Sequence, residues 1–281
     1  MFKIKLYFFL ISIKTFFCGC DHIGNESFRQ QKEKYKIEKV GKLPPIVRES
    51  SGLEIGNSDS TFFTMNDDTE SEIYEISKAG KLINTFPIRD SKNLDWEDLC
   101  KDDKQQLYIG DFGNNFNNRK NLHIYITNVL NQDTKTEKIH FSYEDQLQFP
   151  PHKKDANFDC EAFFYFNDSL YLFSKNRGNK IEKLYSLPAK KGDYVAQIKH
   201  TTKLSGMVTA ADISPDKTKF AILTYGYIYI FNIVNQQINF KNPRSCVKFP
   251  KGKQAEGLIF INNDDMLVTN ENGHIFLVKK R

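Results

Sequence analysis

The segments Asp95-Trp96-Glu97-Asp98-Leu99, Leu107-Tyr108-Ile109-Gly110 and His123-Ile124-Tyr125-Ile126 follow one another and show the pattern that decides the fold. Each is short, apolar and rich in β-branched or aromatic residues, and polar turn residues separate it from the next, which is typical of antiparallel strands. The chain contains no sustained 3.6-residue apolar period, so we expect strands and not helices to build the core.

This three-strand pattern occurs five times. The first strands contain Ser51-Gly52-Leu53, Glu97-Asp98-Leu99, Glu161-Ala162-Phe163, Asp212-Ile213-Ser214 and Glu256-Gly257-Leu258. Weaker fourth strands are expected over Lys81 to Ile88, Lys138 to Tyr143, Tyr194 to Thr202 and Ile238 to Phe249. Repeats of about 45 residues with four strands each predict an all-β protein, a β-propeller.

We expect five blades, although the long second interval, around Phe149-Pro150-Pro151-His152, leaves room for a sixth. The last repeat stops after three strands, and the segment Tyr35 to Val40 has no partner nearby in the sequence. We therefore expect this N-terminal strand to complete the last blade and close the ring, which removes exposed sheet edges. A pair of β-sandwich domains is the alternative.

The N-terminus has the features of a targeting signal. Two lysines precede the apolar run Leu6 to Ile13, which is too short to span a bilayer, and Gly19 stands before Cys20. The pattern resembles a bacterial lipoprotein signal over residues 1–20, with Cys20 lipidated, a polar tether over 21–34 and the propeller over 35–281. This predicts a cell-envelope protein held on a membrane outside the cytoplasm. A simple signal and a buried N-terminal strand are the alternatives.

Composition agrees with a folded domain and excludes some partners. Of the 281 residues 40% are hydrophobic and 27% charged, with 24 Phe and 13 Tyr. Three of the 40 Lys and Arg residues lie in the first 20 positions, which carry no acid, so the remaining 37 against 35 acids leave a charge of +2. This near-neutral balance does not favour nucleic acid as a partner.

Three cysteines remain after Cys20, namely Cys100, Cys160 and Cys246, with no CxxC pair and no His at metal-binding spacing. We expect three buried free thiols, and the alternative is one disulfide.

Acidic residues recur at the start of four of the first strands, which line the central channel of a propeller. The repeat alignment places Glu97, Glu161, Asp212 and Glu256 at equivalent positions. Like charges that converge on one axis raise one another's pKa, so something must compensate them. Ca²⁺ is the cation expected for this set of oxygen ligands. The interpretation that the sequence favours, however, is a polar channel without a cation, in which Lys175, Arg177 or Arg89 neutralises some of the acids and water solvates the others; a bound Ca²⁺ is the alternative.

A second polar set follows the second strands and is expected to surround one mouth of the channel. Its members are Asn66, Asp67, Asp111, Asn114, Lys175, Arg177, Tyr225 and Glu271. Asn residues and their Gly neighbours also suit tight turns, which is the alternative for them. The mixed charges predict a site for a polar or anionic small molecule, bound directly or through a cation.

Several motifs together resemble a family of secreted or lipid-anchored bacterial propellers, akin to phytase-like and NHL-like propellers. They include Glu49-Ser50-Ser51-Gly52-Leu53, Asp95 to Leu99, Gly110 to Asn115, Asp159-Cys160-Glu161-Ala162 and Ala255-Glu256-Gly257. A more distant similarity, through Glu97 to Leu99 and Leu107 to Gly110, is to calcium-activated nucleotidases (apyrases). These resemblances imply the fold and, for the nucleotidases, a calcium ion in the channel.

The residues favour a binding or scaffold module for a polar ligand or an envelope partner. The alternative is a metal-dependent hydrolase of phosphate esters, in which Lys175 and Arg177 hold the anion. Nucleophilic catalysis is not indicated, since the six His residues are scattered and no Gly-x-Ser-x-Gly motif is present.

Overall fold

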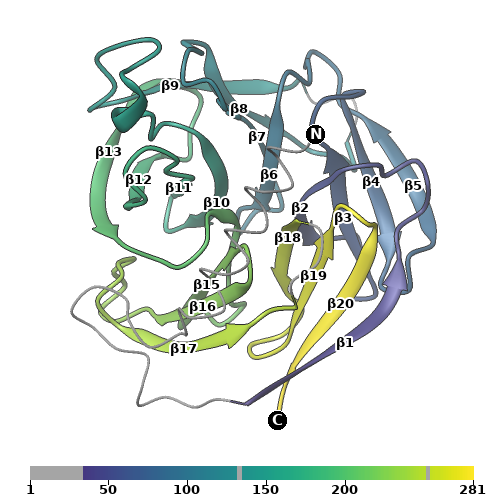
Figure 1. The fold of residues 1–281 in the computed structure, drawn as a ribbon. Coiled ribbons are helices and arrows are strands. Elements are labelled where there is room, and N and C mark those ends of the chain that lie inside the picture. Colours follow the sequence, from purple (N-terminus) through teal and green to yellow (C-terminus); the bar gives the residue numbers. More distant parts are fainter. Residues whose placement is uncertain (1–33, 132–134, 251–253) are drawn as a thin grey trace, which may run out of the picture.

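The computed structural model describes residues 34–131, 135–250 and 254–281, which form an almost entirely β structure (Figure 1). The strands are β1 (Tyr35–Lys42), β2 (Ser50–Ile55), β3 (Thr61–Asn66), β4 (Glu72–Ser77), β5 (Leu82–Pro87), β6 (Trp96–Lys101), β7 (Leu107–Asp111), β8 (Leu122–Thr127), β9 (Glu137–Tyr143), β10 (Cys160–Phe166), β11 (Ser169–Ser174), β12 (Glu182–Pro188), β13 (Gly192–Thr202), β14 (Val208–Ile213), β15 (Lys219–Thr224), β16 (Tyr227–Asn232), β17 (Pro243–Lys248), β18 (Ala255–Phe260), β19 (Met266–Asn270) and β20 (His274–Lys280). A short 3-10 turn, η2 (Lys153–Asp155), lies between β9 and β10. Within these ranges, no helix has the length and apolar character that a membrane span requires.

Consecutive strands form four-stranded antiparallel units arranged around a centre. The units are β2–β5, β6–β9, β10–β13, β14–β17 and β18–β20 together with β1. Their first strands β2, β6, β10, β14 and β18 contact one another in this order, and β18 returns to β2. Figure 1 shows the fourth strands β5, β9, β13 and β17, with β1, around the periphery. The prediction of an all-β propeller is confirmed.

The N-terminal strand closes the ring, as the sequence predicts. β1 pairs antiparallel with β20, from Tyr35 opposite Lys280 to Lys42 opposite His274, with one irregularity between Lys39 and Gly41. The side chains of Tyr35 and Ile37 pack against an apolar cluster shared with the β14–β17 unit. β1 therefore gives the last sheet its fourth strand.

Two outer strands also pair with each other, which the sequence pattern does not predict. Residues Gly192 to Ala196 of β13 run parallel to Ile139 to Tyr143 of β9 and join two units into an eight-stranded sheet. The remainder of β13 pairs with β12 in its own unit. The segment 144–159, where we allowed for further strands, contains only η2 as regular structure.

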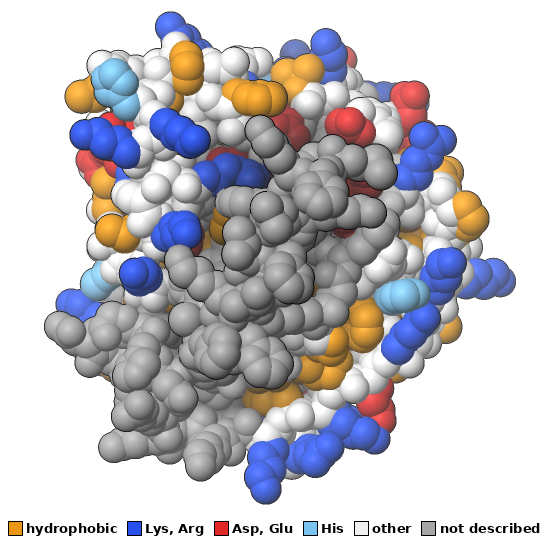
Figure 2. All heavy atoms as spheres, in the orientation of Figure 1, with side chains coloured by type: hydrophobic (Ala, Val, Ile, Leu, Met, Phe, Trp, Pro, Cys, Tyr) orange, Lys and Arg blue, Asp and Glu red, His pale blue; other side chains and the backbone are white. Residues whose placement is uncertain are grey.

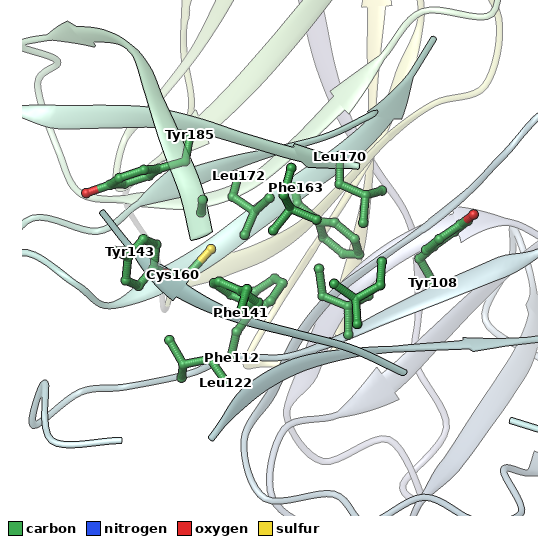
Figure 3. Packing of buried hydrophobic residues seen from close by; sticks show 14 of the residues in the cluster. Tyr108, Phe112, Leu122, Phe141, Tyr143, Cys160, Phe163, Leu170, Leu172 and Tyr185 are labelled. Atoms are coloured by element: carbon green, nitrogen blue, oxygen red, sulfur yellow. The ribbon is translucent and has the colours of Figure 1, made fainter. Parts of the chain in front are cut away.

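The apolar core is divided among the interfaces between neighbouring units. A separate cluster of buried side chains lies at each of the five contacts around the ring, the last one between the β18–β20 unit and the β2–β5 unit. Figure 3 shows the cluster between β6–β9 and β10–β13, in which the Phe112 and Phe163 rings meet edge to face at 5.2 Å between centroids. Because one sheet cannot bury both faces alone, each unit depends on its two neighbours.

Several further expectations can be compared with the structure. The predicted fourth strands correspond to β5, β9, β13 and β17, but β17 begins at Pro243, later than the expected start at Ile238. The predicted signal sequence and Cys20, and the tether up to residue 33, lie outside the described residues.

The cysteines differ in environment. Cys100 and Cys160 are buried free thiols, as expected. Cys246 is disulfide-bonded, so the expectation of three buried free thiols is wrong for this residue. It lies half-buried on an outer strand, whereas Cys100 and Cys160 lie on inner strands.

Ring closure can be tested at Gly80, which lies at a positive φ of 97° against β1. A Cβ there would lie 1.9 Å from the carbonyl oxygen of Lys42, whereas Gly226, at a φ of 101°, has no atom within 4 Å of its Cβ position. We expect Gly226→Ala to lower the free energy of unfolding by about 1–2 kcal/mol for backbone strain. Gly80→Ala should cost at least about 2 kcal/mol more, because it also displaces β1. Urea unfolding of both variants measures the difference, and equal losses would contradict a structural role of the β1 contact.

Candidate functional site

The acids of the first strands reach the channel from β-bulges. Trp96 pairs with Asp111 and Asp98 with Gly110, so Glu97 is an extra residue in β6. Glu161 in β10 and Glu256 in β18 are extra residues in the same way. A bulge locally turns the strand and redirects its side chain. We call the end of the channel where these bulges lie the mouth.

Asp212 does not belong to this set, and its predicted equivalence with the three glutamates is wrong. In β14 the extra residue is Thr209, between Val208 and Ala210. Asp212 lies three residues further along the strand, where its carboxylate accepts a hydrogen bond from the backbone N–H of Phe260 at 2.7 Å. Thr209 instead donates to the carbonyl oxygen of Ala255 at 2.7 Å.

Asp212 belongs to a deeper group of acids that join neighbouring units. Asp98 accepts the N–H of Phe163 at 3.0 Å, and Glu54 accepts the N–H of Lys101 at 2.8 Å. Burial raises the pKa of all three carboxyls, and the charge of Glu54 raises that of Asp212 further. Since each carboxylate bridges to a backbone amide of the next unit, we assign this group a structural role.

The strongest concentration of charge at the mouth involves Glu97, Asp159 and Glu161. One carboxylate oxygen from each of the three lies within 4.8 Å of the others. Asp159 is fully buried, and Glu161 and Glu97 are 4% and 9% exposed. Asp159 directly precedes β10, so it comes from the same unit as Glu161.

Glu97 is the member of this group without a hydrogen bond. No described residue donates to its carboxylate, whereas the N–H of Asn114 donates to Asp159 at 2.9 Å. Gly113 has no side chain and so leaves space for the Glu97 carboxylate. A Cβ at Gly113 would lie 2.3 Å from Oε1 of Glu97 and 2.3 Å from Cγ of Asp95. The carboxylates of Asp95 and Glu97 therefore both lie against a glycine and share one space.

Two basic side chains compensate part of this charge. Nζ of Lys175 lies 2.8 Å from Glu161 and 5.2 Å from the centre of the Tyr225 ring. The Arg177 guanidinium lies 2.9 Å from Asp159 and 3.7 Å from Glu161. Burial is the largest single influence on the pKa of Lys175 and lowers it, but the charges of Glu161, Tyr225 and Asp159 together outweigh burial and hold this pKa above its ordinary value. Both predicted anion-binding residues are thus engaged in ion pairs with acids.

Burial and mutual repulsion shift the pKa values of the acids upwards. Desolvation, then the charge of Glu161, raises the pKa of Glu97 well above its ordinary value. Desolvation raises the pKa of Glu161 despite the opposing charge of Lys175. Asp95 has a pKa of about 6, mainly because of its burial. The mouth therefore takes up protons unless a cation replaces them.

Other residues predicted for the mouth lie around this group. Gln254 donates hydrogen bonds to Glu256, at 3.1 Å, and to Glu271. The pKa of Asp67 is raised to about 7, by burial and then by the charge of Glu49. Figure 2 shows acidic side chains (red) in the upper middle part of the molecule and most basic side chains (blue) around its rim.

Three predicted site residues have structural partners instead. Asn66 accepts the N–H of Arg48 at 2.9 Å and so holds the segment before β2. Asp111 is fully buried and lies 2.8 Å from Arg119 and 3.2 Å from His123. Asn114 is 2% exposed, and its Nδ2 donates to the carbonyl oxygen of Phe158 at 3.1 Å.

The repeat alignment did not select Asp95 or Asp159 as site residues. A signal was available: Asp95-Trp96-Glu97 and Asp159-Cys160-Glu161 share an Asp-x-Glu pattern whose last residue is the bulge. The corresponding positions of two other units hold Glu49 and Gln254. Each of these four polar residues directly precedes the first residue of an inner strand, at the end of the strand that lies at the mouth.

Comparison with known proteins supports the fold. A family model described as SdiA-regulated matches residues 25–220. A similar solved structure is the PQQ-bound aldose sugar dehydrogenase of Streptomyces coelicolor, with a TM-score of 0.50 and 9% identity over 89% of this chain and 100% of that one. Another is the β-propeller domain of Cps50 (Swd1) from Myceliophteria thermophila, with a TM-score of 0.46 and 10% identity over 86% of this chain and 99% of that one.

No curated protein matches the chain. At such low identity the dehydrogenase shares the fold alone, and the resemblance to phytase-like and nucleotidase propellers stays a prediction.

The raised pKa of Asp95 predicts a pH-dependent stability in the presence of a chelator. The stabilisation of the fold by protonated Asp95 is fully present below about pH 4, which is the ordinary pKa of an Asp in the unfolded chain. This stabilisation is lost as the pH rises through about 6, the pKa of Asp95 in the folded protein. Asp95→Asn should therefore raise the melting temperature above pH 6 and flatten the profile between pH 4 and 6. Thermal melts measure this, with Asp103→Asn, an exposed acid on the β6–β7 turn, as the control. An unchanged profile in Asp95→Asn would contradict the assigned environment.

Proposed function

This chain belongs to the SdiA-regulated family, and we propose that it is a lipid-anchored extracytoplasmic propeller whose mouth binds Ca²⁺ and, through it, a polar ligand or an envelope partner. The anchor at Cys20 and the envelope location follow from the N-terminal sequence. The binding role follows from the residues at the mouth.

The observation that carries the proposal is the Glu97 carboxylate. It is 9% exposed, receives no hydrogen bond from a described residue and lies within 4.8 Å of two further buried carboxylates. A charge in this position is costly unless it is paired, because burial removes its hydration. A cation bound between Glu97, Asp159 and Glu161 would supply the missing partner.

The charge balance favours a divalent ion. Asp95, Glu97, Asp159 and Glu161 carry four negative charges when ionised, and Lys175 and Arg177 compensate two of them. Two oxygens bound to one Ca²⁺ lie at most about 5 Å apart, which agrees with the spacing of this group. Carboxylates and flexible geometry suit Ca²⁺ better than Mg²⁺, which requires a near-ideal octahedron.

Binding is favoured over hydrolysis because of the state of the two basic residues. Lys175 and Arg177 would have to hold the substrate phosphate in a hydrolase, but both are in ion pairs with Glu161 and Asp159. A ligand held through the cation does not need an unpaired basic side chain. The metal-dependent hydrolase is therefore the second candidate, and the raised pKa of Asp95 is the feature that would suit a general acid or base.

The cation site predicts a specific loss of Ca²⁺ affinity. Glu97→Gln should weaken binding at least about 10-fold, because it removes a charged ligand and leaves the fold intact. Gly113→Ala should also weaken it, since a Cβ would push the Asp95 and Glu97 carboxylates apart. Calorimetric titration with Ca²⁺ and Mg²⁺ measures both, and Asp103→Asn should bind as the unmodified protein does. Equal affinity in Glu97→Gln would place the ion elsewhere, and no binding by the unmodified protein would remove the proposal.

The choice between binding and hydrolysis can be tested with phosphate esters. We expect no phosphate release from nucleotides or inositol phosphates, with or without Ca²⁺. Turnover that disappears in Glu161→Gln would instead support the hydrolase.

A further inference from the structure

Among the described residues, the two most exposed large hydrophobic side chains lie on neighbouring loops at the mouth face. Phe116 is 81% exposed and Leu147 is 87% exposed. Phe116 lies between β7 and β8, and Leu147 between β9 and β10. β7 ends and β10 begins at the mouth, so both loops project from the same end of the ring as the acidic group.

Both side chains are presented by firmly held backbone. Asn117, next to Phe116, is 1% exposed, and Gln146, next to Leu147, is 6% exposed. Nε2 of Gln146 donates to the carbonyl oxygen of Asn117 at 3.1 Å, and the N–H of Phe158 donates to Oδ1 of Asn117 at 2.7 Å. The two loops are thus joined by buried polar contacts while their apolar residues point outwards.

Basic residues lie on the same two loops as these apolar tips. Nζ of Lys120 lies 5.2 Å from the centre of the Phe149 ring, and Lys153 and Lys154 are exposed on η2. Of the acids in this loop, Asp145 pairs with Lys183, Glu144 accepts the N–H of Ile198, and Asp155 is exposed beside the two lysines of η2. Figure 2 shows blue and orange side chains, with some red and pale blue ones, at the upper left, where Figure 1 places the short helical turn beside β9 and β13.

Further exposed apolar residues lie on the same face. Ile46, Leu94 and Ile181 are each at least 40% exposed and lie in loops at the mouth end of the units. Leu130, which is 70% exposed, lies between β8 and β9 at the opposite end.

We propose that the mouth face docks on an anionic lipid bilayer, with Phe116 and Leu147 entering the interface and Lys120, Lys153 and Lys154 facing the headgroups. Apolar tips bordered by lysines are complementary to a negatively charged membrane surface. The two tips protrude singly from separate loops, whereas a protein partner is met by a contiguous and well-packed apolar patch. Docking in this way turns the channel mouth towards the membrane.

The test compares two introduced tryptophan probes on opposite faces. Phe116→Trp and Leu130→Trp are made in the full chain, and the native Trp96, which is fully buried, provides a constant background. Each protein is mixed with vesicles of phosphatidylglycerol and phosphatidylcholine that contain brominated lipid, which quenches tryptophan within the bilayer. We expect Phe116→Trp to be quenched at least about twofold more than Leu130→Trp, because only the mouth face enters the interface. This readout does not depend on how the N-terminus is attached.

Charge and apolar contributions are then separated. Lys153→Gln and Lys154→Gln, combined with Phe116→Trp, should reduce quenching on anionic vesicles, as should added salt. Vesicles of phosphatidylcholine alone should give weak quenching. Equal quenching of the two probes, or none, would overturn the proposal. A blue shift of Phe116→Trp that depends on protein concentration and not on lipid would instead identify a second copy of the chain as the occupant.

The outcome is independent of the cation site. Measured in a chelator, Phe116→Trp should remain more strongly quenched than Leu130→Trp whether or not Glu97→Gln is added, so a failure of Ca²⁺ binding and a failure of membrane docking are distinguishable.

Discussion

The pairing of β1 with β20 is the contact on which the rest of this molecule depends. It gives the last unit its fourth strand and removes the free edges of an open array. Once the ring is closed, each sheet has a neighbour on both faces, and the apolar side chains divide into five clusters, one at each interface. The same closure brings the inner strands around one axis, so residues far apart in the chain become neighbours.

Closure also creates the electrostatic problem at the mouth. The bulges at Glu97, Glu161 and Glu256 turn carboxylates towards the channel mouth, where Glu97 and Glu161 are at most 9% exposed. Deeper in the channel, Asp98 and Asp212 are satisfied by backbone amides of the next unit. Glu97 has no comparable partner among the described residues, although two of its neighbours are paired with Lys175 and Arg177. A local violation of good packing and pairing is expected at a site that serves a ligand and not stability.

Charge and apolar surface occupy different parts of the same face. The acids converge at the hub, where all units meet, whereas Phe116 and Leu147 lie on long loops at the rim. A cation bound at the hub would reduce the negative charge that otherwise repels an anionic surface. The proposed ion and the proposed membrane contact are therefore compatible on electrostatic grounds, while each rests on its own residues.

The sequence by itself determined the strands, the repeat and the closing role of Tyr35 to Val40, because the alternation of apolar and polar residues and the turn residues act over short distances along the chain. It also contained the Asp-x-Glu pattern at Asp95 and Asp159. Only the tertiary structure decided that Thr209, and not Asp212, occupies the bulge of β14, since a bulge shifts the register by one residue and depends on pairing with β15. It likewise decided that Lys175 pairs with Glu161, that Arg177 pairs with Asp159 and that β9 pairs with β13, because these contacts join residues whose distance is set by the arrangement of the sheets.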